Sequence, residues 1–209
     1  MNIVIIGSGG REHALCYKLL KSSKINKIYC IPGNAGTDEI ATNIFADIND
    51  FDEIYKIVLK LNVELIVVGP EIPLVNGIVD YFEKKNIKIF GPNKKCSQLE
   101  GSKFFMKNIC KKYNIPSAKY FEISDINQIE KFLSSVSFPV VVKSDGLAAG
   151  KGVTICNNLD EVIKDVQEIL DGKFKSSNKV FIEEFLEGEE LSYFAVSYTH
   201  LRAHETEAD

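Results

Sequence analysis

Short apolar runs that end in glycine or proline alternate with amphipathic segments through the first part of the chain. Strands that alternate with helices in this way predict a parallel sheet with helices on both faces. The expected strands are Ile3–Ile6, Ile25–Ile31, Leu65–Val68 and Ile87–Phe90. The expected helices are Arg11–Lys21, Asp50–Leu61 and Ile78–Lys85. The predicted fold class is therefore α/β, with a Rossmann-like N-terminal domain over residues 1–101.

The pattern changes after about Gly101, and no flexible linker marks the border. Helices are expected at Ser102–Tyr113, at Asp125–Leu133 with Ser124 as its cap, and at Leu159–Leu170. Strands are expected at Tyr120–Ile123, Pro139–Lys143, Gly152–Cys156 and Lys179–Phe185. Residues 102–195 are therefore expected to form a second module.

Composition excludes several broad classes of protein. Of the 209 residues 45% are hydrophobic, which is enough for a packed core, and the net charge is -4. A negative chain is a poor general binder of nucleic acid or of membrane surfaces. We find no apolar run of membrane-spanning length, no basic leader and no C-x-x-C pair among the five cysteines. We therefore expect a cytoplasmic protein with buried free thiols.

A glycine-rich turn, Gly7–Glu12, follows the first strand, where backbone N–H groups at a helix start attract anions. It fits a dinucleotide fingerprint poorly, because Glu12 replaces the third glycine and no acidic residue ends the second strand. A tight structural turn, an anion site and an NAD site all stay open, with NAD the least favoured. Pro32–Gly36 and Gly69–Pro73 follow the next two strands. Three such loops at one sheet edge predict a binding edge.

A second glycine-rich loop lies in Val140–Thr154, which reads VVVKSDGLAAGKGVT. It is not a Walker A loop, because its glycine spacing is shorter and strands flank it on both sides. A glycine-rich hairpin tip can fold over a triphosphate, and Lys143 at its base can neutralise phosphate charge. The alternative is an ordinary hairpin turn. Further on, the acidic segment Phe181–Glu190 is either a nucleotide edge or a solvated turn.

Seven segments together resemble the phosphoribosylamine–glycine ligase (glycinamide ribonucleotide synthetase) family of the ATP-grasp superfamily. They are GSGGREHAL, PGNAGT, VVGPEIPLVNGIVD, IFGPN, LEGSKFFMK, VVKSDGLAAGKGV and IEEFLEGEE, in order from Met1 to about Ala195. The resemblance implies a pre-ATP-grasp domain followed by the first part of an ATP-grasp domain. It also implies a reaction of purine synthesis, in which ATP converts glycine to glycyl phosphate and 5-phosphoribosylamine displaces the phosphate.

The resemblance also implies roles for individual residues. Lys103 and Lys143 would contact the ATP phosphates, and Lys143 is our candidate catalytic residue. The lid over the triphosphate would be Gly146, Leu147, Ala148, Ala149, Gly150, Lys151 and Gly152. Adenine and ribose would be met by Glu183, Glu184, Leu186 and Glu190. The 5-phosphoribosylamine would lie near Gly9, Gly10, Arg11, Asn34 and Glu71.

The family pattern stops near Ala195, and the ligands for Mg²⁺ or Mn²⁺ are expected beyond it, so we predict no metal site and no ligase activity in this chain alone. Residues 196–209 match nothing expected next, and we interpret them as a foreign segment rather than a zinc site built on His200 and His204. Two alternatives stay open: another ATP-grasp carboxylate–amine ligase or carboxylase, and a non-catalytic nucleotide-binding module.

Overall fold

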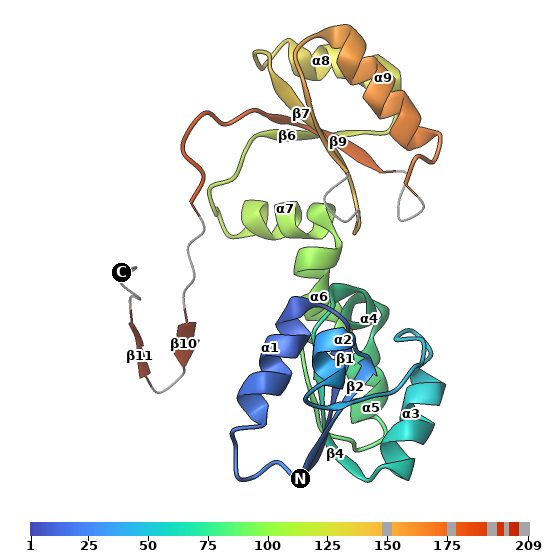
Figure 1. The fold of residues 1–209 in the computed structure, drawn as a ribbon. Helices are drawn as coiled ribbons and strands as arrows, with labels where there is room; N and C mark the ends of the chain where they lie inside the picture. The colour runs from blue at the N-terminus through green and yellow to red at the C-terminus, as the bar shows by residue number, and fades with distance from the viewer. Residues whose placement is uncertain (148–151, 175–178, 192–195, 199–200, 205–209) are drawn as a thin grey trace.

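In the described residues, a five-stranded and a four-stranded sheet are joined by a pair of helices (Figure 1). The computed structural model describes residues 1–147, 152–174, 179–191, 196–198 and 201–204. Helix α7 (Lys103–Lys112) lies between the two sheets, and α6 (Lys94–Gly101) leads into it from the N-terminal one (Figure 1).

The N-terminal sheet has five parallel strands in the order β3-β2-β1-β4-β5, which confirms the predicted fold class. The strands are β1 (Asn2–Gly7), β2 (Lys27–Pro32), β3 (Thr42–Asn43), β4 (Val63–Val68) and β5 (Ile89–Phe90). The helices around them are α1 (Gly10–Leu19), α2 (Ala35–Asp38), α3 (Phe51–Lys60), α4 (Glu71–Asn76) and α5 (Ile78–Glu83).

Alternate residues of the central strand β1 enter two separate cores. Val4 and Ile6 pack with residues of α3 and α5, whereas Ile3 and Ile5 pack with Cys16 of α1. Because side chains alternate across a strand, helices must cover both faces of this sheet. The continuous apolar run in the sequence therefore reflects a strand that is buried on both sides.

The short elements α2, β3 and α4 of this half were not expected from the sequence. Helix α4 contains Pro73 and ends at Gly77, which adopts a left-handed φ of 97°. Helix α2 is a single turn capped by the side chain of Asn34, which accepts a hydrogen bond from Thr37 N at 3.0 Å. Elements this short carry no helical periodicity that a sequence pattern can show.

The C-terminal sheet is antiparallel, in the order β6-β9-β7-β8. Its strands are β6 (Tyr120–Ile123), β7 (Val140–Ser144), β8 (Val153–Cys156) and β9 (Val180–Glu184). One face packs on α9 (Leu159–Leu170), the 3₁₀ turn η1 (Ile126–Gln128) and α8 (Ile129–Leu133). The cap predicted at Ser124 is wrong: Asp125 holds that position, and its carboxylate accepts from Asn127 N at 2.9 Å.

Helices α6 and α7 meet at Ser102, which ends the first and caps the second. Helix α6 also packs against α4 of the N-terminal half. Beyond β9, residues of β10 (Val196–Tyr198) and β11 (Leu201–His204) pair as an antiparallel ribbon. None of the helices in the described part of the chain has the length and apolar character that a membrane crossing needs.

All five cysteines lie in described residues and are free. Three of them, Cys16, Cys30 and Cys156, are buried as expected, but Cys96 is exposed and Cys110 is only partly covered. The thiols of Cys16 and Cys30 are in contact, with their sulfur atoms 3.1 Å apart. Burial raises the pKa of Cys156 to about 11, which keeps that thiol protonated.

Candidate functional site

The three loops at the carboxyl edge of the N-terminal sheet contact one another. Asn34 Nδ2 donates to Ser8 O at 2.9 Å and to Gly9 O at 3.2 Å, which joins the loops after β2 and β1. Arg11 Nη2 donates to Glu71 Oε1 at 3.0 Å, which joins α1 to the start of α4. The predicted residues Gly9, Gly10, Arg11, Asn34 and Glu71 are thus gathered at one edge. Their contact with a substrate stays a prediction.

Glu12, which argued against a dinucleotide site, has a structural position in this edge. Its side chain is 3% exposed, and Oε2 accepts from Gly9 N at 2.6 Å, as an acidic residue in the first turn of a helix often does. The carboxylate fills the space left by three missing side chains, at Gly7, Gly9 and Gly69. These glycines are therefore explained in part by a buried carboxylate, which sequence reasoning did not anticipate.

The exposed pair of Arg11 and Glu71 gives this edge both signs of charge. A hydrogen bond from its own backbone N–H lowers the pKa of Glu71, and the Arg11 side chain lowers it further. The same pair raises the pKa of Arg11. The Arg11 side chain is 70% exposed.

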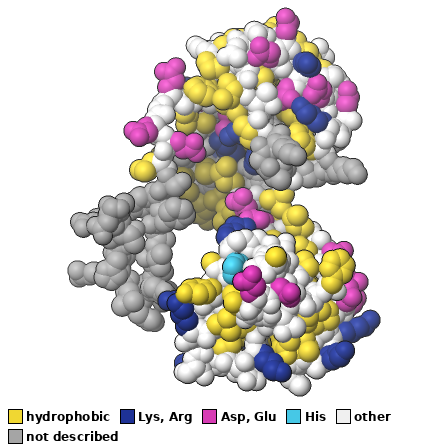
Figure 2. Space-filling model, viewed as in Figure 1, with side chains coloured by type: hydrophobic (Ala, Val, Ile, Leu, Met, Phe, Trp, Pro, Cys, Tyr) yellow, Lys and Arg dark blue, Asp and Glu magenta, His cyan; other side chains and the backbone are white. Residues whose placement is uncertain are grey.

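A cavity of about 560 Å³ lies between the two halves. Figure 2 shows that the molecule narrows between the two halves, and that basic and acidic side chains lie close together there. The cavity brings together residues of both halves: Glu71, Leu99, Glu100, Lys103, Met106, Lys143, Gly146, Leu147, Gly152 and Val153. Five of the predicted ATP residues therefore share one cavity with Glu71 of the predicted substrate edge.

Lys103 begins α7 and reaches the start of the glycine-rich loop. Its Nζ donates to Gly146 O at 2.9 Å. Burial lowers the pKa of Lys103, while the nearby carboxylate of Asp145 opposes this shift. Gly146 adopts a φ of 83°, a left-handed conformation that favours glycine. The predicted lid residues Ala148, Ala149, Gly150 and Lys151 lie outside the described residues.

Asp145, which precedes Gly146 of the glycine-rich loop, attaches that loop to the start of α7. It was not among the residues predicted from the sequence. Its carboxylate accepts from Ser102 Oγ at 3.2 Å and from Phe104 N at 3.3 Å, so it sits at the N-terminus of α7. A carboxylate is favourable there because the helix dipole and the free N–H groups are positive. The sequence signal that could have found it is an acidic residue directly before Gly146, at a position where no helix begins.

Lys143 and Glu183 lie diagonally on neighbouring antiparallel strands, which explains their contact. The register places Lys143 opposite Phe181 and Val141 opposite Glu183. Long side chains at diagonal positions on one face reach each other, and Lys143 Nζ lies 2.6 Å from Glu183 Oε2. On the other oxygen, Glu183 Oε1 lies 2.9 Å from Nζ of Lys107. Lys107 was not among the predicted site residues.

The remaining predicted nucleotide residues follow β9. Glu184 Oε1 accepts from Lys119 N at 2.9 Å, while Leu186 and Glu190 are exposed. Their contact with adenine and ribose stays a prediction. Within the described ranges, the His, Cys, Asp and Glu side chains form no group of three that could hold a metal ion, so where the expected metal ligands lie also stays a prediction.

Comparisons with known proteins agree across both halves. The family model described as phosphoribosylglycinamide synthetase, N domain, matches residues 1–100. The model of the ATP-grasp (A) domain of the same synthetase matches residues 101–204. The second match runs past Ala195, and the domain division at 101 and 195 drawn from the sequence stays a prediction.

Individual relatives carry the same description. The chain is 44% identical over 202 residues to a phosphoribosylamine–glycine ligase of Clostridium acetobutylicum, covering 94% of this chain and 48% of the relative. It is also 44% identical to a bifunctional purine biosynthetic protein of Dictyostelium discoideum, of which it covers 24%. The chain thus spans about half, or less, of the curated relatives it matches.

Solved structures show the same fold. The crystal structure of a Thermotoga maritima phosphoribosylamine–glycine ligase matches with a TM-score of 0.74 and 33% identity, over 94% of this chain and 47% of that one. The biotin carboxylase domain of a Hydrogenobacter thermophilus 2-oxoglutarate carboxylase matches with a TM-score of 0.73 at 18% identity. At that identity the likeness shows the shared fold alone.

Proposed function

Because the chain belongs to the phosphoribosylglycinamide synthetase family, we propose that the protein carrying it joins glycine to 5-phosphoribosylamine at the expense of ATP. The observation that carries this proposal is the shared cavity between the halves. It places Lys103, Lys143 and the start of the glycine-rich loop beside Glu71 of the N-terminal edge. A nucleotide held by the C-terminal half would therefore lie next to a substrate held by the N-terminal half.

The chemistry assigns a task to each side of the cavity. The carboxylate of glycine attacks the γ-phosphorus of ATP, ADP leaves, and glycyl phosphate forms. The amine of 5-phosphoribosylamine then attacks the glycyl carbonyl, phosphate leaves, and an amide forms. Lys103 and Lys143 would neutralise the phosphate charge, and fixed cations of this kind lower the barrier to phosphoryl transfer.

The N-terminal edge supplies groups suited to a sugar phosphate. Arg11 presents an exposed guanidinium, which matches a phosphate in shape and charge. Gly10 lies exposed at the start of α1, where N–H groups attract anions, whereas the N–H of Gly9 is already bonded to Glu12. We propose that the 5-phosphate lies here and that the amine points toward Glu71 and the cavity.

Phosphoryl transfer from ATP would also use a divalent cation, which would neutralise phosphate charge. The described residues offer no ligand set for it, so no step is assigned to it here. A cytoplasmic location and the use of small-molecule substrates alone are part of the same proposal.

The direct test is a turnover assay on the full-length protein that contains this chain. ADP release should require both glycine and freshly made phosphoribosylamine, and the product should be their amide. Bicarbonate with biotin or an aminoimidazole ribonucleotide serves as the control for the related carboxylase reactions. ADP release driven by those substrates, and not by glycine, would overturn the proposal. Binding of ATP without any turnover would favour a non-catalytic nucleotide-binding module.

A further inference from the structure

Helix α7 covers the face of the C-terminal sheet opposite to α9, and its inner surface is partly basic. Phe104 packs edge-on against Phe181 of β9, with ring centroids 5.2 Å apart. Lys107 lies one turn along the helix, 4% exposed, which is rare for a lysine. The helix therefore brings a buried ammonium group directly over the strand that carries Glu183.

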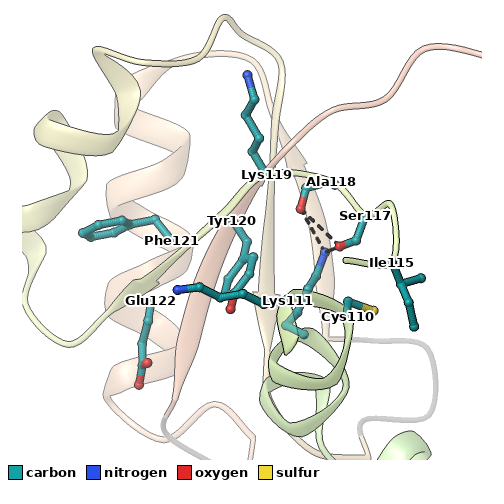
Figure 3. A pocket seen from close by; sticks show the side chains of 10 residues that line it. Cys110, Lys111, Ile115, Ser117, Ala118, Lys119, Tyr120, Phe121 and Glu122 are labelled. Carbon is teal, nitrogen blue, oxygen red and sulfur yellow. Dashed lines mark hydrogen bonds between the residues drawn. The ribbon is translucent and has the colours of Figure 1, made fainter. Parts of the chain in front are cut away.

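Among the described residues, Lys107 contacts the segment before β6 and the strand β9. Its Nζ donates to Ser117 Oγ at 2.7 Å and to Ala118 O at 3.2 Å, lies 5.3 Å from the centre of the Tyr120 ring, and pairs with Glu183 Oε1 at 2.9 Å. Figure 3 shows Ser117, Ala118 and Tyr120 around the pocket of about 450 Å³ on this side of α7. Lys107 thus lines this pocket and does not line the cavity between the halves.

One carboxylate, that of Glu183, is shared by two ammonium groups that differ in exposure. The side chains of Lys107 and Glu183 are each 5% exposed, whereas that of Lys143 is 27% exposed. Of the three, only Lys143 lines the cavity that is proposed to hold the nucleotide. Lys107 is therefore the more buried partner of the carboxylate, and Lys143 is the more exposed one.

A buried carboxylate left without a cation is strongly unfavourable. If Glu183 had Lys143 as its sole partner, the nucleotide could recruit Lys143 only by leaving that carboxylate uncompensated. With Lys107 in place, Lys143 can turn from Glu183 to a phosphate while Glu183 stays paired. Lys107, Lys143 and Glu183 together carry one net positive charge, and the ammonium of Lys143 can then bring it to a phosphate in the cavity.

We propose that Lys107 is a positioning residue for nucleotide binding: it holds Glu183 neutralised, so that Lys143 is free to bind the phosphates. This inference rests on the proposed function, since it requires that the cavity hold a nucleotide. It assigns to Lys107 an effect on nucleotide phosphates although Lys107 does not line that cavity.

The test is a double-mutant cycle in the full-length protein, with ATP and adenosine affinities measured by calorimetry. Lys107→Met should weaken ATP binding roughly tenfold to hundredfold, the scale of one charge-assisted hydrogen bond. Adenosine, which has no phosphate, should lose less than about threefold in affinity. In a Glu183→Gln background, where Lys143 has no carboxylate to leave, adding Lys107→Met should have little further effect on ATP.

Two controls separate positioning from folding. Lys111→Met removes an ammonium from the same helix, one turn further on, at the pocket in Figure 3, and should leave the affinity for ATP unchanged. Lys107→Arg keeps the charge and should recover most of the ATP affinity if Lys107→Met folds poorly. Thermal unfolding of each variant shows whether the fold is retained.

The outcomes are distinct. If the unmutated protein binds no nucleotide, the proposed function itself fails. If it binds ATP, but Lys107→Met weakens ATP and adenosine equally, or acts equally in both backgrounds, then Lys107 is a structural residue and the inference is wrong.

Discussion

Replacing Gly69 by alanine should destabilise the N-terminal half by displacing Glu12. Gly69 has no positive φ, so its need for glycine is a matter of space. A methyl group there would touch Glu12 Oε1 and lie 2.6 Å from Cδ and 2.8 Å from Cγ of the same side chain. Atoms at those separations overlap, so the carboxylate must move.

Two terms set the size of the effect. Overpacking a filled interior costs about 1–3 kcal/mol. The displaced carboxylate also gives up its 2.6 Å hydrogen bond from Gly9 N, and losing a bond to a charged group costs about 1.5–3 kcal/mol. We therefore expect a loss of about 2.5–6 kcal/mol, or a fall in Tm on the order of 10 °C for a protein of this size.

Urea unfolding of the chain and its variants measures this loss. Gly10→Ala is the matched control, because a methyl group at Gly10 meets no atom within 4 Å, and it should be neutral or stabilise by less than about 1 kcal/mol. In a Glu12→Ala background the overlap is gone, so Gly69→Ala should then change stability by less than about 1 kcal/mol. An equal loss in both backgrounds would refute the role given to Glu12.

Three further predictions concern the binding edge and the cavity. Lys143→Ala in the full-length protein should weaken ATP binding and leave the circular dichroism spectrum unchanged; unchanged affinity in the folded variant contradicts the role of Lys143. Hydrogen exchange over residues 146–152 should slow when ATP is added, as for a lid, and equal exchange in both states would count against one. Because the pKa of Glu71 lies below its ordinary value of 4.5, its pair with Arg11 stabilises the fold above that pH and is lost as pH falls further. Tm should therefore fall less steeply below pH 4.5 in Glu71→Gln than in the parent, and identical slopes would rule this out.

The sequence patterns located the longer elements well. Strand β6 and helix α9 have the predicted bounds, because a short run rich in aromatic and β-branched residues and an apolar stripe on a helix are both visible within a short window. Helix α6 was missed, since it is polar and short, and its N-cap at Asn93 follows a proline turn. Its place is set by packing on α4, which no local pattern records.

The sequence predicted which loops of the candidate site lie together, but it did not predict the buried contacts of that site. Parallel strands bring their carboxyl ends to one edge, so the grouping of Asn34, Arg11 and Glu71 followed from the order of the elements. The pairing of Lys107 with Glu183 did not, because it depends on the way α7 lies against β9. The burial of Glu12 likewise depends on a gap that the nearby Gly7 and Gly9 leave together with the distant Gly69.

The hydroxyl of Ser102 makes two hydrogen bonds at the junction between α6 and α7. It caps α7 by accepting from Phe105 N at 3.1 Å, and it donates to Asp145 at the entrance of the glycine-rich loop. The two matched family domains divide at residues 100 and 101, inside the last turn of α6. A chimera of two relatives spliced at that border would inherit the hydroxyl from one parent and the helix ahead of it from the other. Swaps of the N-terminal half, or insertions of a reporter protein, should therefore keep residues 93–112 as one block and place the joint in the loop that follows.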